Sequence, residues 1–113
     1  MTEKTCPQDL KDLLKALYGF SSQEVETLNS LCGEERRVEE LADRLEKDRS
    51  TVQRYLSSLK AANLVERKSK VNKGGKGRFY IYKAEYSRVK KVIEARFQRW
   101  EKEKLESLES MKD

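Results

Sequence analysis

Residues Asp48–Val65, DRSTVQRYLSSLKAANLV, decide the fold, because two different faces alternate along them at helical spacing. Val52, Leu56 and Leu59 recur every three or four positions, as on a helix that packs one side against a core. The other side carries hydroxyl, amide and guanidinium groups where an ordinary solvated helix has Glu and Lys: Ser50, Thr51, Gln53, Arg54, Ser57 and Ser58. Such groups form hydrogen bonds readily, so this helix is expected to bind another molecule.

The flanking residues indicate a helix-turn-helix. A short helix from Glu39 to about Glu46 comes first, and Asp48 is expected to cap the next helix at its start. Asn63, a common substitute for glycine just after a helix, should end it. The second helix therefore spans about residues 49–62.

A β-hairpin is expected next. Residues 64–71 are plausible strand, and residues 77–83 are rich in aromatic and β-branched side chains, as strands are. Between them, residues 72–76 contain two glycines and form a basic turn. The hairpin should cover about residues 64–83.

Helices are also expected at both ends of the chain. Near the N-terminus, Pro7 suits the first turn of a helix whose apolar stripe is Leu10, Leu13, Leu14 and Leu17. Residues 21–24, Ser-Ser-Gln-Glu, form a capping box for a second helix that should end at the left-handed Gly33. A long helix runs from about Glu85 to the end, with the apolar stripe Tyr86, Val89, Ile93, Phe97 and Trp100, followed by Leu105 and Leu108.

The charge is divided along the chain. Ten basic residues and one acid, Glu66, lie between Arg49 and Lys83, a net of +9 in a chain whose total is +5, so the rest sums to −4. A basic block between mildly acidic flanks indicates a surface for a polyanion. The alternative is a lysine-rich solvated loop.

Composition argues against several classes of protein. No apolar stretch is long enough for a membrane span, and MTEKTCPQDL lacks the apolar core of a signal peptide. Two cysteines, Cys6 and Cys32, and no histidine cannot make the usual zinc site, so no metal or cofactor is expected. We expect a cytoplasmic protein whose thiols are reduced, with a redox switch as the less favoured alternative. No nucleophile–base pair or phosphate-binding loop indicates an enzyme.

The helix and the hairpin together suit double-stranded DNA. A B-DNA major groove admits one α-helix, where Gln53 can pair with adenine and Arg54 with guanine or a phosphate. Lys73, Lys76 and Arg78 on the hairpin would then lie at the adjacent minor groove or its phosphates. The glycines beside them allow the backbone to approach closely.

A family resemblance agrees with this interpretation. Residues 38–82, VEELADRLEKDRSTVQRYLSSLKAANLVERKSKVNKGGKGRFYIY, resemble the core of archaeal and bacterial winged helix-turn-helix transcription regulators of the MarR, ArsR and TrmB type. The resemblance covers about residues 20–84, and its signature positions are Glu40-Leu41-Ala42, Ser50-Thr51-Val52-Gln53-Arg54, Leu56, Leu59 and Asn63-Leu64-Val65. The metal-binding Cys and His of ArsR-type sensors and the sugar-binding domain of TrmB are missing.

The resemblance implies a mainly α fold with a small β-hairpin, a winged helix-turn-helix with a long C-terminal helix. It implies a sequence-specific, stand-alone transcription regulator whose DNA contacts are Ser50, Thr51, Gln53, Arg54, Lys73, Lys76 and Arg78. Arg49 and Ser57 on the same helix are further candidate contacts, and the alternative for Ser57 and Ser58 is a solvated helix face. The alternative is a winged helix for protein contact, or an architectural DNA-binding module of the transcription or chromatin machinery. The sequence indicates neither the operator, nor the sign of regulation, nor an effector.

A homodimer is expected because one winged helix reads few base pairs, and such proteins double their contacts through twofold symmetry. The C-terminal stripe is too large and aromatic to stay wet. The predicted dimer contacts are Leu10, Leu14, Tyr86, Val89, Ile93, Phe97 and Trp100. The alternative is that this stripe packs on its own domain. The expected division is a DNA-binding domain, 1–84, and a dimerisation helix, 85–113.

Overall fold

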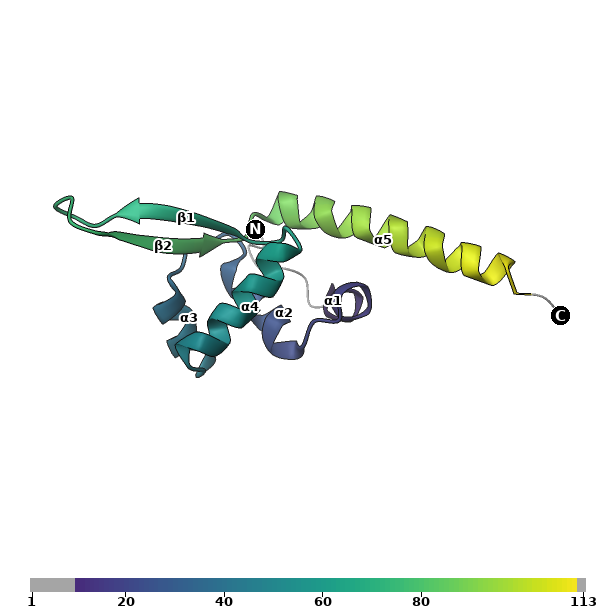
Figure 1. Ribbon diagram of the computed structural model, residues 1–113, viewed down its shortest axis with the longest axis horizontal. Coiled ribbons are helices and arrows are strands. Elements are labelled where there is room, and N and C mark those ends of the chain that lie inside the picture. The colour runs from purple at the N-terminus through teal and green to yellow at the C-terminus, as the bar shows by residue number, and fades with distance from the viewer. Residues whose placement is uncertain (1–9, 112–113) are drawn as a thin grey trace, which may run out of the picture.

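A computed structural model describes residues 10–111 of the chain and shows a winged-helix fold, confirming the expected fold class (Figure 1). Helices and a hairpin follow one another in the expected order. The elements are α1 Leu10–Tyr18, α2 Ser22–Leu31, α3 Val38–Leu45, α4 Arg49–Ala61, β1 Glu66–Val71, β2 Arg78–Lys83 and α5 Tyr86–Glu109. Pro7 and Cys6 lie outside the described residues.

The capping box at the start of α2 is confirmed. The backbone N–H of Ser21 donates to Glu24 Oε1 at 2.8 Å, and the N–H of Glu24 donates to Ser21 Oγ at 3.2 Å. The other end of α2 also agrees with the expectation, because Gly33 is left-handed (φ +78°) directly after the C-cap residue Cys32, which is extended. Cys32 is extended because it forms a β-bridge with Ala84, and the chain changes direction at the next residue, Gly33.

The turn between α3 and α4 fixes the start of α4. Glu46 takes the left-handed conformation, and Asp48 then caps α4 as expected, accepting the backbone N–H of Thr51 at 3.2 Å. Asn63 is also left-handed, at φ +63°, which confirms its role just beyond the end of the helix. Short polar side chains at these ends therefore set the length of α4.

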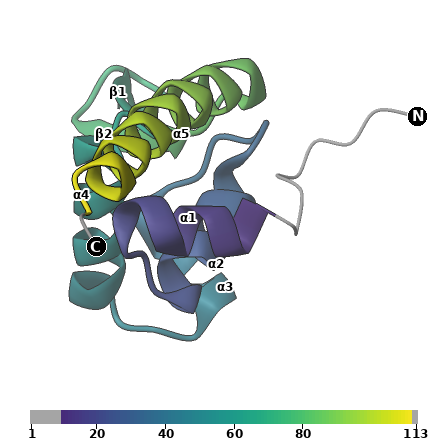
Figure 2. The ribbon, with the colours of Figure 1, turned by 90° about the vertical axis from the view of Figure 1, so that its right-hand side faces the viewer.

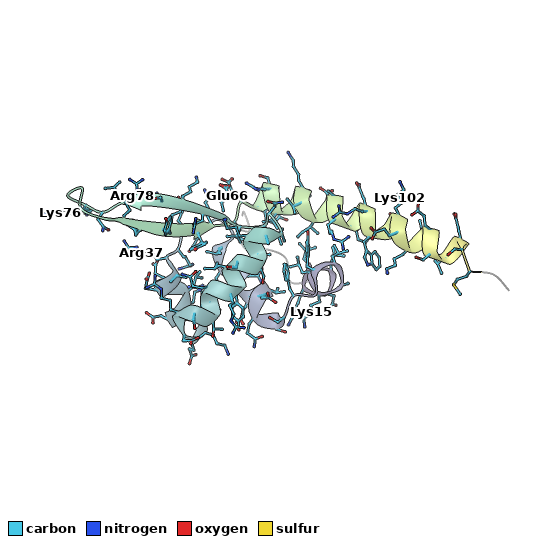
Figure 3. All side chains as sticks on the ribbon, in the orientation of Figure 1. Lys15, Arg37, Glu66, Lys76, Arg78 and Lys102 are labelled. Carbon is cyan, nitrogen blue, oxygen red and sulfur yellow. The ribbon has the colours of Figure 1, made fainter. Side chains whose placement is uncertain are left out.

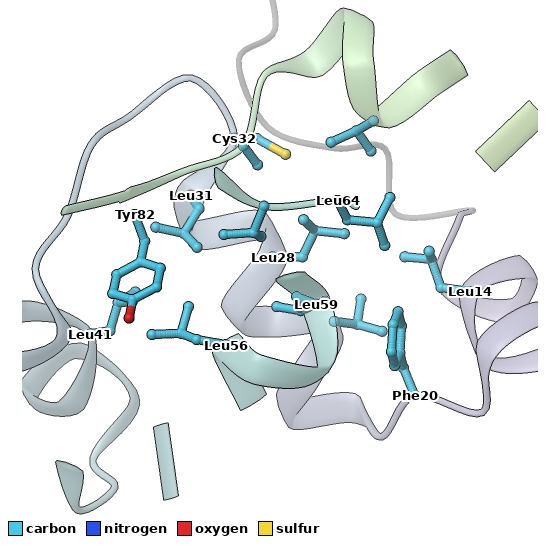
Figure 4. Packing of buried hydrophobic residues seen from close by; sticks show 14 of the residues in the cluster. Leu14, Phe20, Leu28, Leu31, Cys32, Leu41, Leu56, Leu59, Leu64 and Tyr82 are labelled. Atoms are coloured by element: carbon cyan, nitrogen blue, oxygen red, sulfur yellow. The ribbon is translucent and has the colours of Figure 1, made fainter. Parts of the chain in front are cut away.

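The core lies between α2, α3 and α4 and includes the base of the hairpin (Figure 4). Val52, Leu56 and Leu59 of α4 are at most 1% exposed, as their spacing predicted. Leu28 of α2 and Leu41 of α3 are fully buried in the same cluster. Since burying one such side chain is worth about 1.5–3 kcal/mol, this contact holds α4 with its polar face outward.

The hairpin is shorter than expected at its start. Leu64 and Val65 are buried in the core, and β1 begins only at Glu66. The strands pair antiparallel, from Glu66 opposite Lys83 to Val71 opposite Arg78. In the turn, Gly74 and Gly75 both have positive φ, where a side chain would be strained.

Helix α5 crosses above α1 and then extends beyond it (Figures 1 and 2). Val89 and Ile93 in its first half are buried in the core, whereas Leu105 and Leu108 in its second half are 55% and 61% exposed. The first half of α5 is therefore part of the folded domain. The second half projects from it with apolar side chains in contact with water.

Cys32 is buried beside the core and is disulfide-bonded, so the expectation of a reduced thiol at this position is wrong. The local sequence offers no signal for this bond. As for membranes, none of the helices between residues 10 and 111 combines the length and the apolar character that crossing one would need.

Candidate nucleic-acid interface

The outward face of α4 is open, as its sequence pattern predicted. Gln53 and Arg54 are exposed, and so are Arg49, Ser50 and Ser57, whereas Thr51 is half-buried. The Ser50 hydroxyl donates to Asp48 Oδ2 at 3.1 Å, which leaves its oxygen free to accept. In Figure 1 the N-terminal end of α4 and the hairpin both lie toward the left of the molecule, and α5 projects to the right.

Asp48 stabilises the first turn of α4, from which this face begins. Hydrogen bonds from Thr51 and from Ser50 hold the pKa of the Asp48 carboxyl below its usual value. The carboxylate stays charged at the start of α4, where it satisfies a backbone donor that would otherwise lack a partner. The residues expected to meet DNA thus begin on a well-defined first turn.

Basic side chains lie at and near the tip of the hairpin. Lys73 and Lys76 are exposed in the turn, and Arg78 follows at the start of β2 (Figure 3). The Arg78 Nε–H donates to Ser69 Oγ at 2.9 Å across the strands. Glu66, the acid of the basic segment, lies at the base of the hairpin and pairs with Arg88 of α5 at 3.3 Å. Its charge is therefore kept away from the tip.

A second ion pair fixes the hairpin to the loop before α3. Lys70 Nζ lies 3.1 Å from Glu35 Oε1. The hydrogen bond from Lys70 holds the pKa of the Glu35 carboxyl below its usual value, and the charges of Lys70, Lys83 and Lys68 act in the same direction. Both partners are partly exposed, so the pair contributes orientation more than stability.

A hollow of about 350 Å³ separates the start of α4 from β2. It brings together Arg49, Gln53 and Arg78, three residues that sequence analysis predicted as DNA contacts. Lys73 and Lys76 do not line it, because they lie farther out on the hairpin. A second hollow, of about 550 Å³, lies on the other side of Gln53 and includes Arg54 and Ser57.

Arg37 also lines the hollow between α4 and β2, and reasoning from the sequence missed it. Its guanidinium carbon lies 3.8 Å from the centroid of the Phe79 ring, a cation–π contact between the start of α3 and β2. The sequence places Arg37 in a charged turn, and no local pattern pairs it with an aromatic residue on a strand. Only the tertiary fold identifies it.

Known proteins resemble this chain in sequence and in structure. Residues 21–67 match the model of the bacterial regulatory protein, arsR family. The uncharacterized proteins MJ1503 and MJ1082 of Methanocaldococcus jannaschii are 32% and 34% identical to it, over 78% and 80% of this chain and 67% and 76% of their own lengths. The chain belongs to the same family as these two proteins.

Solved structures share the fold. A possible transcriptional regulator from Methanosarcina mazei Go1 has a TM-score of 0.77 at 22% identity, over 100% of this chain and 98% of that one. A mutant of MepR from S. aureus, bound to an oligodeoxyribonucleotide, has a TM-score of 0.56 at 18% identity, over 94% of this chain and 75% of that one.

The chain carries an ArsR-type helix-turn-helix domain at residues 21–67, within a winged-helix fold. The domain match confirms the expected resemblance to ArsR-type proteins and the expected class of function, a DNA-binding regulator. The solved structures confirm the winged-helix fold. This family and fold are those of regulators, which are not enzymes. Helix α4 is the second helix of the helix-turn-helix, and residues Glu66–Lys83, which comprise β1, the turn and β2, form the hairpin called the wing below.

Proposed function

We propose that the regulator binds double-stranded DNA as a homodimer, with each α4 in a major groove and each wing at the neighbouring minor groove. The observation that carries the proposal is the hollow that Gln53 of α4 shares with Arg78 of the wing. Groups able to read base edges and groups able to bind phosphate thus face the same space. Binding to chromosomal DNA also implies that the regulator acts in the cytoplasm.

Each contact residue has a role that fits its place. Gln53, exposed about one turn after the start of α4, is a reader of base edges, with adenine as its natural partner. Arg54 reads guanine or binds a phosphate. Short hydroxyls and the first-turn arginine supply further contacts to bases or backbone: Arg49, Ser50, Thr51 and Ser57.

The wing tip supplies charge. Lys73 and Lys76 are exposed on either side of Gly74 and Gly75, so their ammonium groups can reach phosphates next to the minor groove. Neither residue has an acidic partner among the ion pairs of residues 10–111. Their contribution to binding is therefore electrostatic and independent of sequence.

The second half of α5 supports the homodimer. Phe97, Leu105 and Leu108 of α5 are between 37% and 61% exposed, and Met111, just beyond the end of the helix, is 73% exposed. Such exposure is unusual for large apolar side chains that lie close together in the sequence. Trp100 is partly buried and stacks near Phe97, with ring centroids 6.1 Å apart. A second copy of α5 would cover these side chains.

Three of the predicted dimer residues can act on this interface only indirectly, because they are buried in their own chain. Leu14, Val89 and Ile93 are buried in the core of their own chain, so they hold α1 and α5 in place. Leu10 and Tyr86, which are half-buried and exposed, remain proposed contacts. The boundary between residues 84 and 85 then separates two proposed functions, DNA binding and dimerisation. It does not separate two folded units, because residues on both sides of it share one core.

Charge along α5 favours an antiparallel pair. The stretch from Tyr86 to Trp100 carries five basic residues and one acid, and the stretch from Glu101 to Glu109 carries four acids and two lysines. Two antiparallel copies place the basic half of one helix beside the acidic half of the other. A parallel pair would place like charges together.

The experiment is a selection of bound fragments from random DNA, followed by titrations at several salt concentrations. We expect a recurring motif with twofold symmetry, bound roughly a thousandfold more tightly than bulk DNA. With about six to ten phosphate contacts, affinity should fall on the order of a thousandfold between roughly 50 and 200 mM salt. Binding with no sequence preference would reject a specific regulator, and no binding would reject the DNA interface itself.

A further inference from the structure

The hollow between α3, α4 and β2 concentrates positive charge from three separate elements. Arg37 stands before α3, Arg49 begins α4 and Arg78 begins β2, and all three line the space. Glu39 is the single carboxylate among its lining residues. Three guanidiniums and one carboxylate leave a formal charge of about +2 in a space that is open to solvent.

Arg37 is held in place and still has donors to offer. Its backbone N–H donates to Glu40 Oε1 at 2.7 Å, so Glu40 completes the helix end, and the Arg37 side chain is not needed there. The face of its guanidinium lies on Phe79 at 3.8 Å. Because stacking uses the face of the group, the N–H bonds at its edge remain available. No acidic side chain between residues 10 and 111 forms an ion pair with it.

Arg49 and Arg78 each interact with one other side chain and can still donate hydrogen bonds to an anion. Arg49 Nη1 lies 2.9 Å from Glu39 Oε2, but both side chains are more than half exposed, at 65% and 57%, so water weakens the pair. Arg78 uses its Nε–H on Ser69 Oγ and keeps its two terminal nitrogens. Both can therefore turn toward an anion in the hollow.

The position of the hollow identifies that anion. One sugar–phosphate strand separates a major groove from the neighbouring minor groove. A protein with α4 in one groove and its wing in the other must straddle this strand, and the space between α4 and β2 is where the strand would pass. Guanidiniums bind phosphate through paired N–H groups.

We propose that the hollow seats one backbone phosphate of the bound DNA, with Arg37 and Arg78 as its donors. Arg49 joins them when the phosphate displaces Glu39. The inference rests on the proposed DNA binding and names a contact within it. The phosphate carries no sequence information, so this contact sets how deeply α4 enters the groove, and Gln53 then reads the bases.

Glu39 acts as an internal competitor. Without DNA its carboxylate holds Arg49, and each phosphate that enters must replace it. Glu39→Gln removes the competing charge while it keeps the shape of the side chain. This variant should bind the selected and the scrambled duplex several-fold more tightly, with the ratio of the two affinities unchanged, because a phosphate contact carries no sequence information.

The decisive experiment compares Arg37→Ala with the wild-type regulator on the selected duplex and on a scrambled duplex, across a series of salt concentrations. Loss of one phosphate contact in each subunit should lower the slope of log affinity against log salt by about two for a dimer. Affinity should fall roughly tenfold or more on both duplexes, with their ratio unchanged. Lys102→Ala, an exposed charge far along α5 (Figure 3), is the matched control and should alter neither quantity.

A second variant distinguishes phosphate binding by Arg37 from a purely structural role of Arg37 in holding the wing. Phe79→Leu keeps an apolar side chain but removes the ring on which Arg37 lies. We expect it to lower affinity less than Arg37→Ala and to keep most of the salt slope. An equal loss of slope in both variants, or no loss in Arg37→Ala, would overturn the phosphate seat. If the wild type itself shows no salt-dependent DNA binding, the proposed function fails instead.

Discussion

Arg36 and Tyr82 exchange both of their backbone hydrogen bonds, at 2.9 and 2.8 Å, although they stand on opposite sides of the helix-turn-helix in the sequence. The exchange makes Arg36 a one-residue third strand beside β2. Tyr82 is at the same time buried against the core. The base of the wing is therefore fixed relative to α3, and through α3 to α4. Wing and helix should meet DNA as one rigid surface.

Gln53→Ala should relax the base preference of the regulator at one position of each half-site. The amide of Gln53 is exposed and can form two hydrogen bonds to an adenine, which discriminate by about 1–3 kcal/mol against other bases. Selection from random DNA with the variant, beside the wild type, measures the loss directly.

Lys73→Ala is the matched comparison, because it removes a wing contact that should involve only phosphate. It should weaken binding evenly across sequences and lower the salt slope, with the selected motif unchanged. If Lys73→Ala altered the motif and Gln53→Ala did not, the roles assigned to helix and wing would be exchanged.

The double substitution Leu105→Glu, Leu108→Glu should produce a monomer. Both leucines are more than half exposed and face away from the core of their own chain, so the fold should remain intact. Losing the second subunit should reduce DNA affinity roughly a hundredfold or more, because the half-sites then bind independently. Light scattering at micromolar concentration measures the mass, and Ser107→Ala, a neutral change at an exposed position on another side of α5, should leave it unchanged. A wild-type monomer in the same measurement would reject the dimer.

Sequence predicts those features whose cause lies within a few residues. Ser21 and Glu24 satisfy one another three positions apart, Asp48 caps α4 from one position outside it, and Asn63 tolerates a left-handed backbone. The helical spacing of Val52 and Leu56 likewise predicts the buried side of α4 without reference to any tertiary contact. Local energetics decide each of these features, so local patterns reveal them.

Contacts between distant segments could not be predicted in this way. Nothing near Arg37 in the sequence indicates Phe79, and nothing near Arg36 indicates Tyr82. The extended Cys32 at the end of α2 has the same origin, because its bridge partner Ala84 follows the wing. In each case the contact depends on the wing folding back across the start of α3, which only the assembled core determines.

Asp48 should make the stability of the regulator sensitive to acid. Hydrogen bonds from Thr51 and Ser50 lower the pKa of this carboxyl below 3.8, the value expected for an unfolded chain. Its contribution is therefore complete above about pH 4 and is lost as the pH falls through the lower, folded value. Asp48→Asn keeps a capping oxygen without the charge, so thermal unfolding from about pH 5 to about pH 2 should show a smaller decline in Tm for this variant. Asp48→Ala should lower Tm by about 4 °C at pH 7. Identical acid profiles for the wild type and Asp48→Asn would contradict the assignment.

Asn63 should tolerate glycine but not alanine. Its φ of +63° lies in the left-handed region, where a Cβ without a compensating polar group costs about 1–2 kcal/mol. Asn63→Ala should therefore reduce the free energy of unfolding by about 1 kcal/mol, and Asn63→Gly should leave it nearly unchanged. Urea unfolding of the two variants measures both values. Equal losses would show that the Asn63 side chain acts by some other contact.

Arg96→Met should leave the regulator as stable as before or more stable. Among the described residues, Arg96 Nη1 and Tyr18 Oη are both buried without a hydrogen-bond partner, and they line the same concavity between α1 and α5. A buried donor without a partner costs about 1–3 kcal/mol, which methionine removes while it keeps the apolar stem. Burial raises the pKa of Tyr18 and the positive charges of Arg96 and Arg99 lower it, so the variant should also ionise Tyr18 at higher pH. Urea unfolding and ultraviolet titration measure the two effects. A loss of more than about 1 kcal/mol would show that Arg96 meets an acceptor in the folded dimer.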